Sequence, residues 1–149
     1  MPEDYLGPPA GDFGSGHWGH RMALRILLVI HAVITLAAGI VLIAAPGAIP
    51  GAVGIALSPG SFLICYLLAG AEFAIAFLSA YGAWCRGVGA RHAVIGTLIV
   101  FHGSTAALEL YALAQGLDTR LWANVALRLT VVALFAWLGL LRSPVLRVR

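Results

Sequence analysis

Charged residues are scarce in this sequence, and lysine does not occur at all. Only 10% of the 149 residues are charged, whereas 61% are hydrophobic and the mean hydropathy is +0.96. A soluble domain is about 25% charged, so this composition excludes a soluble globular domain and indicates a single membrane domain. The nine arginines are scattered along the chain and do not form the basic stripe of a nucleic-acid-binding protein. No nucleic-acid partner is therefore expected.

Cysteine is also scarce, and its placement excludes a structural disulfide or zinc site. Cys65 and Cys85 fall in one predicted helix, and their spacing separates them by about 30 Å. That distance is too long for a disulfide bond. The chain has no CxxC pair and no Cys/His cluster, and its apolar runs hold no Glu-x-x-His motif of a di-metal site. We therefore expect no metal centre.

Long apolar runs are abundant by contrast. Four runs occur, each of about 23–26 residues, which is enough to cross a hydrocarbon core of about 30 Å. They lack the period-two alternation of barrel strands, and the short links between them make neighbouring helices antiparallel. The sequence predicts an all-α fold, an integral membrane antiparallel four-helix bundle, with spans at 22–45, 61–84, 90–115 and 119–141.

The segments outside these runs have a different composition. Residues 1–20 are rich in Gly and Pro and predict a disordered cytoplasmic tail. Their acidic start does not fit a secretory signal peptide. Residues 143–149 predict a short basic cytoplasmic tail. The uncharged link 46–60 contains three prolines and predicts a short turn or half-helix at the membrane interface.

Small residues inside the spans indicate close helix packing. Glycines fall there together with many alanines, and four of these glycines are Gly39, Gly70, Gly96 and Gly103. In lipid, small side chains let helices approach closely and pack by direct contact. We therefore expect these positions to lie at helix–helix contacts.

The arginines predict the orientation of the chain. Seven of them flank one end of the spans: Arg21, Arg25, Arg86, Arg91, Arg142, Arg147 and Arg149. The opposite end has only Arg120, which lies close to Asp118. The positive-inside rule places the arginine-rich end in the cytoplasm. We expect a multi-pass protein of the cell (inner) membrane with both termini in the cytoplasm.

Five ionisable residues lie inside the spans and away from their ends, where each costs about 2.5–3.5 kcal/mol at the bilayer centre. Two of them, Glu109 and Arg128, fall about 10 Å and about 13 Å from the same end of adjacent antiparallel helices. This agreement in depth predicts an ion pair, and Asn124 lies one turn from Arg128 on the same face. The pair is open to two interpretations, a clasp between two helices or part of a binding site.

The other three ionisable residues in the spans, His31, Glu72 and His102, come from the first three helices. His31 and His102 fall at nearly equal depth, and Glu72 lies somewhat nearer the outside. Hydroxyl and thiol groups share their faces, namely Thr35 with His31, Thr105 with His102, and Cys65 and Ser79 with Glu72. These polar stripes among apolar neighbours indicate that the helices bring polar groups together in the interior.

The order of these features resembles the DoxX-like family of small four-helix membrane proteins. Two stretches carry the resemblance, "LRILLVIHAVITLAAGIVLIAAP" and "LLAGAEFAIAFLSAYGAWCRGVGARHAVI". Similarity of this kind covers about residues 21–142. The resemblance implies a membrane partner of a redox protein, and it implies Glu72 and Arg86 as family-type positions.

Several functions fit this pattern. In the first, the chain is a membrane subunit or accessory protein that binds a lipophilic, quinone-like redox partner, with His31, His102, Asn124 and Arg128 as binding residues. In the second, it is a membrane-embedded enzyme for an isoprenoid or polyketide substrate, with Glu72 and Glu109 as catalytic acid or base.

Two further readings remain open. His31 and His102 are candidate axial ligands of a b-type haem, which a Soret band would reveal. Alternatively, the polar groups only specify packing in a structural or assembly protein. The cofactor and any enzymatic activity are thus undecided, and the expected partners are the lipid bilayer, a hydrophobic small molecule, a membrane or redox protein, and further copies of the chain.

Overall fold

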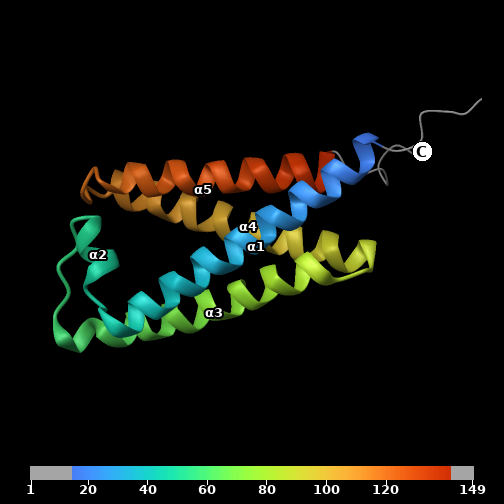
Figure 1. The fold of residues 1–149 in the computed structure, drawn as a ribbon. Coiled ribbons are helices and arrows are strands. Elements are labelled where there is room, and N and C mark those ends of the chain that lie inside the picture. Colours follow the sequence, from blue (N-terminus) through green and yellow to red (C-terminus); the bar gives the residue numbers. More distant parts are fainter. Residues whose placement is uncertain (1–14, 142–149) are drawn as a thin grey trace, which may run out of the picture.

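The computed structural model describes residues 15–141, and helices account for nearly all of this part of the chain, with no strand in it (Figure 1). The tails at 1–14 and 142–149 lie outside the described residues. The elements, in chain order, are α1 (Ser15–Ala44), α2 (Ala48–Ala52), η1 (Pro59–Ser61), α3 (Phe62–Trp84), α4 (Val88–Ala114), α5 (Leu121–Phe135) and η2 (Ala136–Leu141).

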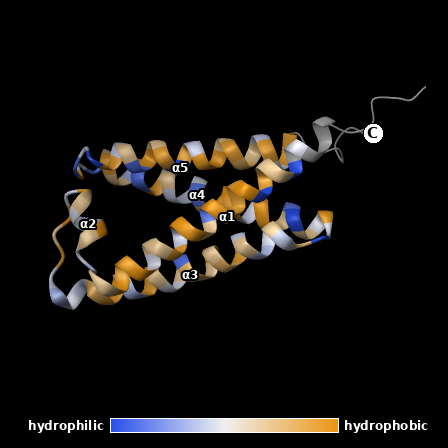
Figure 2. Cartoon of the chain, in the orientation of Figure 1, coloured by the Kyte–Doolittle hydropathy of each residue, from blue (hydrophilic) through white to orange (hydrophobic). Residues whose placement is uncertain are grey.

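Four helices are long and apolar enough to cross a membrane, and they match the predicted spans to within a few residues. Their bounds are Arg21–Ala44, Pro59–Trp84, Val88–Ala114 and Leu121–Leu141, where η2 continues α5 as a π-helical turn. Many large apolar side chains are exposed along these helices, and most of their residues are coloured as hydrophobic in Figure 2. This outward hydrophobicity is typical of helices that face lipid.

One boundary differs from the prediction. α1 begins at Ser15, inside the segment 1–20 that was expected to be a disordered tail. The stretch between Ser15 and Arg21 contains no proline, so the backbone of the first span continues back through it without losing a hydrogen bond.

Proline and glycine residues lie at the ends of several helices. Pro46 and Gly47 follow α1, and the link then forms the short helix α2 and the turn η1, as expected for a half-helix in this link. Cys85 and Gly87 have extended backbones and separate α3 from α4. Gly116 ends the α4 turn with φ of 92°, a conformation that favours glycine because it has no Cβ.

α1 and α3 pack along their length as an antiparallel pair, and α4 and α5 form a second pair (Figure 1). Facing contacts fix the register of α1 against α3. Leu28 lies against Gly82, His31 bonds Ser79, and Gly39 lies against Phe73. Residue numbers rise along α1 as they fall along α3, as in any antiparallel pair.

Glycines allow the close contacts in this arrangement, but only one of the four expected positions does so. A Cβ at Gly39 would lie 2.5 Å from Phe73, whereas a Cβ at Gly70, Gly96 or Gly103 would meet nothing within 4 Å. The expectation was therefore wrong for these three residues, which lie away from the helix contacts. Gly82 is a second contact glycine, because its Cβ would lie 2.7 Å from Val94.

The buried residues form two apolar clusters with polar groups between them. The larger cluster holds Leu28, Leu98 and Phe135 near the end where the chain passes from α3 to α4, and a smaller one holds Leu42 and Cys65 near α2. On α1, the buried His31 and Thr35 lie between the two clusters. The fold thus encloses a polar region within an otherwise apolar interior.

Candidate functional site

Two histidines meet between the helix pairs. His31 of α1 and His102 of α4 are both at least 90% buried, and their Nε2 atoms lie 2.8 Å apart in a hydrogen bond. His31 also bonds through Nδ1 to the hydroxyl of Ser79 on α3 at 2.8 Å. The equal depth expected for the two histidines is confirmed, because the rings are in direct contact across the two pairs.

The partners at both ends determine the direction of these bonds. Arg128 Nη1 lies 3.5 Å from His102 Nδ1, and a guanidinium can only donate. His102 Nδ1 therefore accepts, and His102 donates from Nε2 to Nε2 of His31. His31 then donates from Nδ1 to Ser79, whose hydroxyl donates to the carbonyl of Ile75 at 2.9 Å. Every donor in this series has an acceptor when both imidazoles are neutral.

The predicted ion pair continues the series on the other side of Arg128. Arg128 Nε donates to Glu109 Oε1 at 2.8 Å, and Asn124 Nδ2 donates to the same oxygen at 2.6 Å. The side chains of Arg128 and Glu109 are 19% and 13% exposed, so the pair lies largely out of solvent. Both the pair and the participation of Asn124 are confirmed.

We call the linked residues the polar network: Ser79, His31, His102, Arg128, Glu109 and Asn124. It connects all four long helices, with one residue each from α1 and α3 and two each from α4 and α5. Its hydrogen bonds are directional. If one partner of such a bond is removed, the other partner stays unsatisfied in an apolar interior, and this costs free energy. The network therefore ties the two helix pairs together in one register.

Glu72 is not part of this network. Ser79, not Glu72, is the α3 residue that meets His31, since the antiparallel register puts Glu72 about 10 Å further along α1. Glu72 is half-buried and makes no hydrogen bond or salt bridge with any residue between 15 and 141.

One oxygen of the network has no partner. Glu109 uses Oε1 for both of its hydrogen bonds, and Oε2 is buried with no donor among the described residues. A buried carboxylate oxygen without a donor is costly. This atom and the Glu72 carboxyl are the two acceptors at which a hydroxyl, an amine or a proton would be stabilised.

The histidine pair does not fit a haem in this arrangement. Two axial metal–nitrogen bonds of about 2 Å each would need the two nitrogens well over 3 Å apart, with a macrocycle between the rings. The Nε2 atoms are 2.8 Å apart, and the rings meet edge to face at 84°. Phe135 packs against His31 from a third side. The two Nε2 atoms that would bind a haem iron are thus already bonded to each other.

Ser79 and Thr35 illustrate what the sequence left undecided. Ser79 is fully buried and carries the network on α3, although the sequence only placed it on the face of Glu72. Thr35 is also buried, one turn from His31. Depth does not select Ser79, because counting along α1 and α3 from their link places His31 between Glu72 and Ser79.

The polar network can pass a proton only over part of its length. Two neutral imidazoles and a hydroxyl in series can exchange protons along their bonds. Arg128 ends this series, because a guanidinium is not deprotonated in proteins, and Glu109 lies beyond it. The arrangement offers a proton store at the histidines and open acceptors at the carboxyl groups.

No family model, curated protein or solved structure matches the chain.

Proposed function

We propose that the four helices form a membrane-spanning bundle that binds a lipophilic, quinone-like redox partner at the polar network. In this proposal the chain is a membrane subunit or accessory protein of a redox system in the inner membrane, with both termini in the cytoplasm. The resemblance to DoxX-like proteins points to the same class of partner. An embedded enzyme and an assembly protein are the alternative functions, and they differ from this proposal in whether the chain binds a quinone and whether it turns over a substrate.

The observation that carries the proposal is the unpartnered Glu109 Oε2 beside Arg128. A quinol hydroxyl would donate to this oxygen or to Glu72, and a quinone carbonyl would accept from Arg128. The carboxyl groups would then take the protons released when a quinol is oxidised to a quinone, while the two electrons pass to the redox protein. His102 and His31 lie on the far side of Arg128, which does not relay protons, so the carboxyl groups alone take these protons.

The chemistry of the charges supports a site as well as a clasp. With Glu72 and Glu109 ionised, Arg128 compensates only one of two negative charges in an apolar interior. An uncompensated carboxylate there is expensive, so Glu72 requires a proton or a ligand donor. A purely structural clasp needs Glu109 and Arg128 but gives no reason for Glu72.

The first test is an absorption spectrum of the full chain purified in mild detergent, followed by mass spectrometry of its organic extract. We expect a co-purifying quinone and no Soret band. A colourless protein that carries no quinone, and that binds no added short-chain quinone, contradicts the proposal. A Soret band would contradict both the direct bond between the two histidines and the proposal of a bound quinone.

The second test is Glu72→Gln, which keeps the shape of the side chain and removes its charge. We expect normal yield, because Glu72 makes no bond in the fold, and quinone binding weakened by about tenfold or more, which is the contribution of a hydrogen bond to a charged group. Titration of tryptophan fluorescence with a short-chain quinone measures the change. Ser104→Ala is the control, because the hydroxyl of Ser104 bonds only within its own helix.

The embedded enzyme is the second candidate, and the same two carboxyl groups favour it. Glu72, half-buried and without a bond among the described residues, is free to act as a general acid or base. Turnover of an isoprenoid or polyketide that disappears in Glu72→Gln, in a protein that binds no quinone, would establish this function. If the variant equals the wild type in both assays, the assembly function remains.

A further inference from the structure

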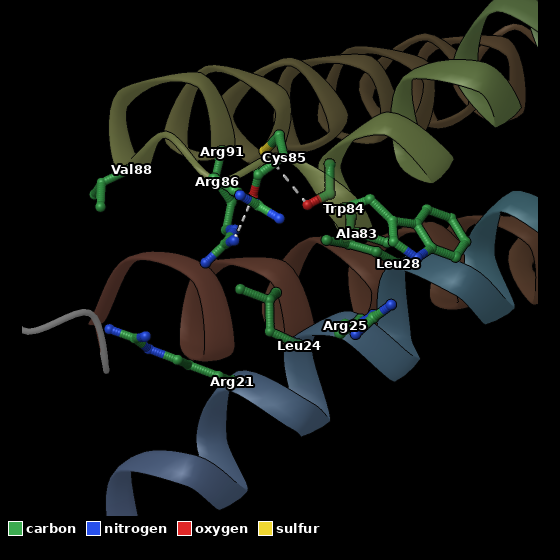
Figure 3. A pocket seen from close by; sticks show the side chains of 11 residues that line it. Arg21, Leu24, Arg25, Leu28, Ala83, Trp84, Cys85, Arg86, Val88 and Arg91 are labelled. Carbon is green, nitrogen blue, oxygen red and sulfur yellow. Dashed lines mark hydrogen bonds between the residues drawn. The ribbon is translucent and has the colours of Figure 1, made fainter.

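A second charged region lies outside the polar network, in a pocket of about 570 Å³ where α1, the end of α3 and the start of α4 meet (Figure 3). Four arginines line it, Arg21 and Arg25 from α1 and Arg86 and Arg91 from the opposite side. Figure 3 shows these two groups facing one another across the pocket. No acidic residue belongs to the lining.

The carboxylates of the described chain lie elsewhere. Glu109 bonds Arg128, Asp118 pairs with Arg120 near the α4–α5 turn, and Glu72 is not among the lining residues of the pocket. The pocket thus gathers four positive charges with no counter-ion of its own between residues 15 and 141. Like charges held together repel, so the pocket is stabilised by an anion.

Two of the arginines are held in place. Arg91 Nη2 donates to the carbonyl of Cys85 at 2.6 Å, and the guanidinium of Arg25 lies 5.5 Å from the ring centre of Trp84. α4 begins at Val88 beside them, and no side chain caps its first turn. The first backbone N–H groups of a long helix add to the positive potential. These groups suit a phosphate, which arginine binds well.

An apolar groove adjoins the pocket at Trp84. A second hollow, of about 350 Å³, runs between α1 and α3, and Trp84 lines both. Its other lining residues are all apolar, and on α3 they extend from Trp84 to Phe73. That stretch is about 16 Å long, or about half of a hydrocarbon core of about 30 Å. The groove therefore matches one acyl chain in one leaflet.

We propose that the pocket and the groove together bind one anionic phospholipid. Its phosphate lies among the four arginines, and one acyl chain lies in the groove between α1 and α3. A soluble phosphate shares the headgroup chemistry but would leave the groove empty. The inference rests on the proposed membrane insertion and is independent of the quinone, so either can fail without the other.

Native mass spectrometry of the full chain in detergent, titrated with phosphatidylglycerol, tests the proposal. We expect one tight lipid, weak binding of phosphatidylcholine, and weakening by about fivefold for each arginine removed in Arg21→Gln and Arg86→Gln. Ala80→Leu, which fills the groove, changes no charge. It is expected to weaken the binding of phosphatidylglycerol by the same factor as one arginine substitution. Arg120→Gln and Ala126→Leu, both away from the pocket and the groove, are the matched controls.

Three results would overturn the assignment. Equal binding of phosphatidylcholine and phosphatidylglycerol would indicate an unspecific lipid belt. Competition by millimolar inorganic phosphate together with no effect of Ala80→Leu would assign the pocket to a soluble anion. Equal losses in the arginine variants and in Arg120→Gln would show that only the total charge matters. Binding of a quinone is measured separately in the same variants and is expected to be unchanged.

Discussion

At the scale of single residues, Arg128 holds the one buried charge pair of the described spans. It neutralises Glu109 through a bond of 2.8 Å and contacts His102. Arg128→Leu leaves the Glu109 carboxylate buried and unpaired. We expect a loss of about 3–5 kcal/mol in the free energy of unfolding, seen as lower yield and a lower thermal midpoint in detergent.

Two further variants separate the ion pair from a general effect of arginine removal. Arg120→Leu removes an exposed pair of 3.9 Å and is expected to change stability by less than about 1 kcal/mol. The double variant Glu109→Leu with Arg128→Leu is expected to recover most of the loss, because apolar replacement of a buried pair is often neutral. A stable single variant Arg128→Leu would contradict the importance of the ion pair.

The same residues indicate how far sequence reasoning reaches. Glu109 and Arg128 could be paired in advance, because depth along a helix follows from residue numbers and opposite charges attract. The bond from His31 to Ser79 could not, since serine carries no charge to mark it and costs little in lipid. Glu72 is charged and was therefore overvalued as a partner of the histidines.

At the scale of helices, contact glycines position α3 against its neighbours. Gly82 is buried, and a Cβ there would meet the branched side chain of Val94, which has little freedom to move. Gly82→Ala is expected to destabilise the protein by about 1–3 kcal/mol, as overpacking does. Thermal unfolding in detergent measures the change.

Gly70 provides the control on the same helix. A Cβ at this position meets nothing within 4 Å, and alanine is the better helix former by about 1 kcal/mol. Gly70→Ala should therefore keep or slightly raise the thermal midpoint. If both variants behave alike, the contact of α3 with α4 does not depend on Gly82.

The spans themselves followed from the sequence, whereas the rotation of each helix did not. Length, hydropathy and helix-ending Pro and Gly are local properties, and they placed the four helices to within a few residues. Which face of α3 meets α1 depends on contacts between distant residues. α3 is apolar nearly all round, so nothing in its composition distinguished Gly82, which packs inside, from Gly70, which does not.

At the scale of the whole molecule, the charges divide between two places. The arginine pocket lies at one end of the helices, and the polar network lies deeper inside. Leu28 lines the pocket floor, is 1% exposed, and precedes His31 by one turn. The buried side chain of Leu28 thus lies between the arginine pocket and His31 along α1.

This division predicts how the chain is oriented, and its two cysteines make the test simple. In Cys65→Ser, Cys85 remains as a half-buried thiol at the arginine end. Thr119→Cys, made in a chain with both native cysteines changed to serine, puts an exposed thiol in the α4–α5 turn. By the positive-inside rule, a membrane-impermeant maleimide should label Thr119→Cys in intact spheroplasts and Cys85 only after lysis. The reverse pattern would invert the orientation and place the arginine pocket outside the cell.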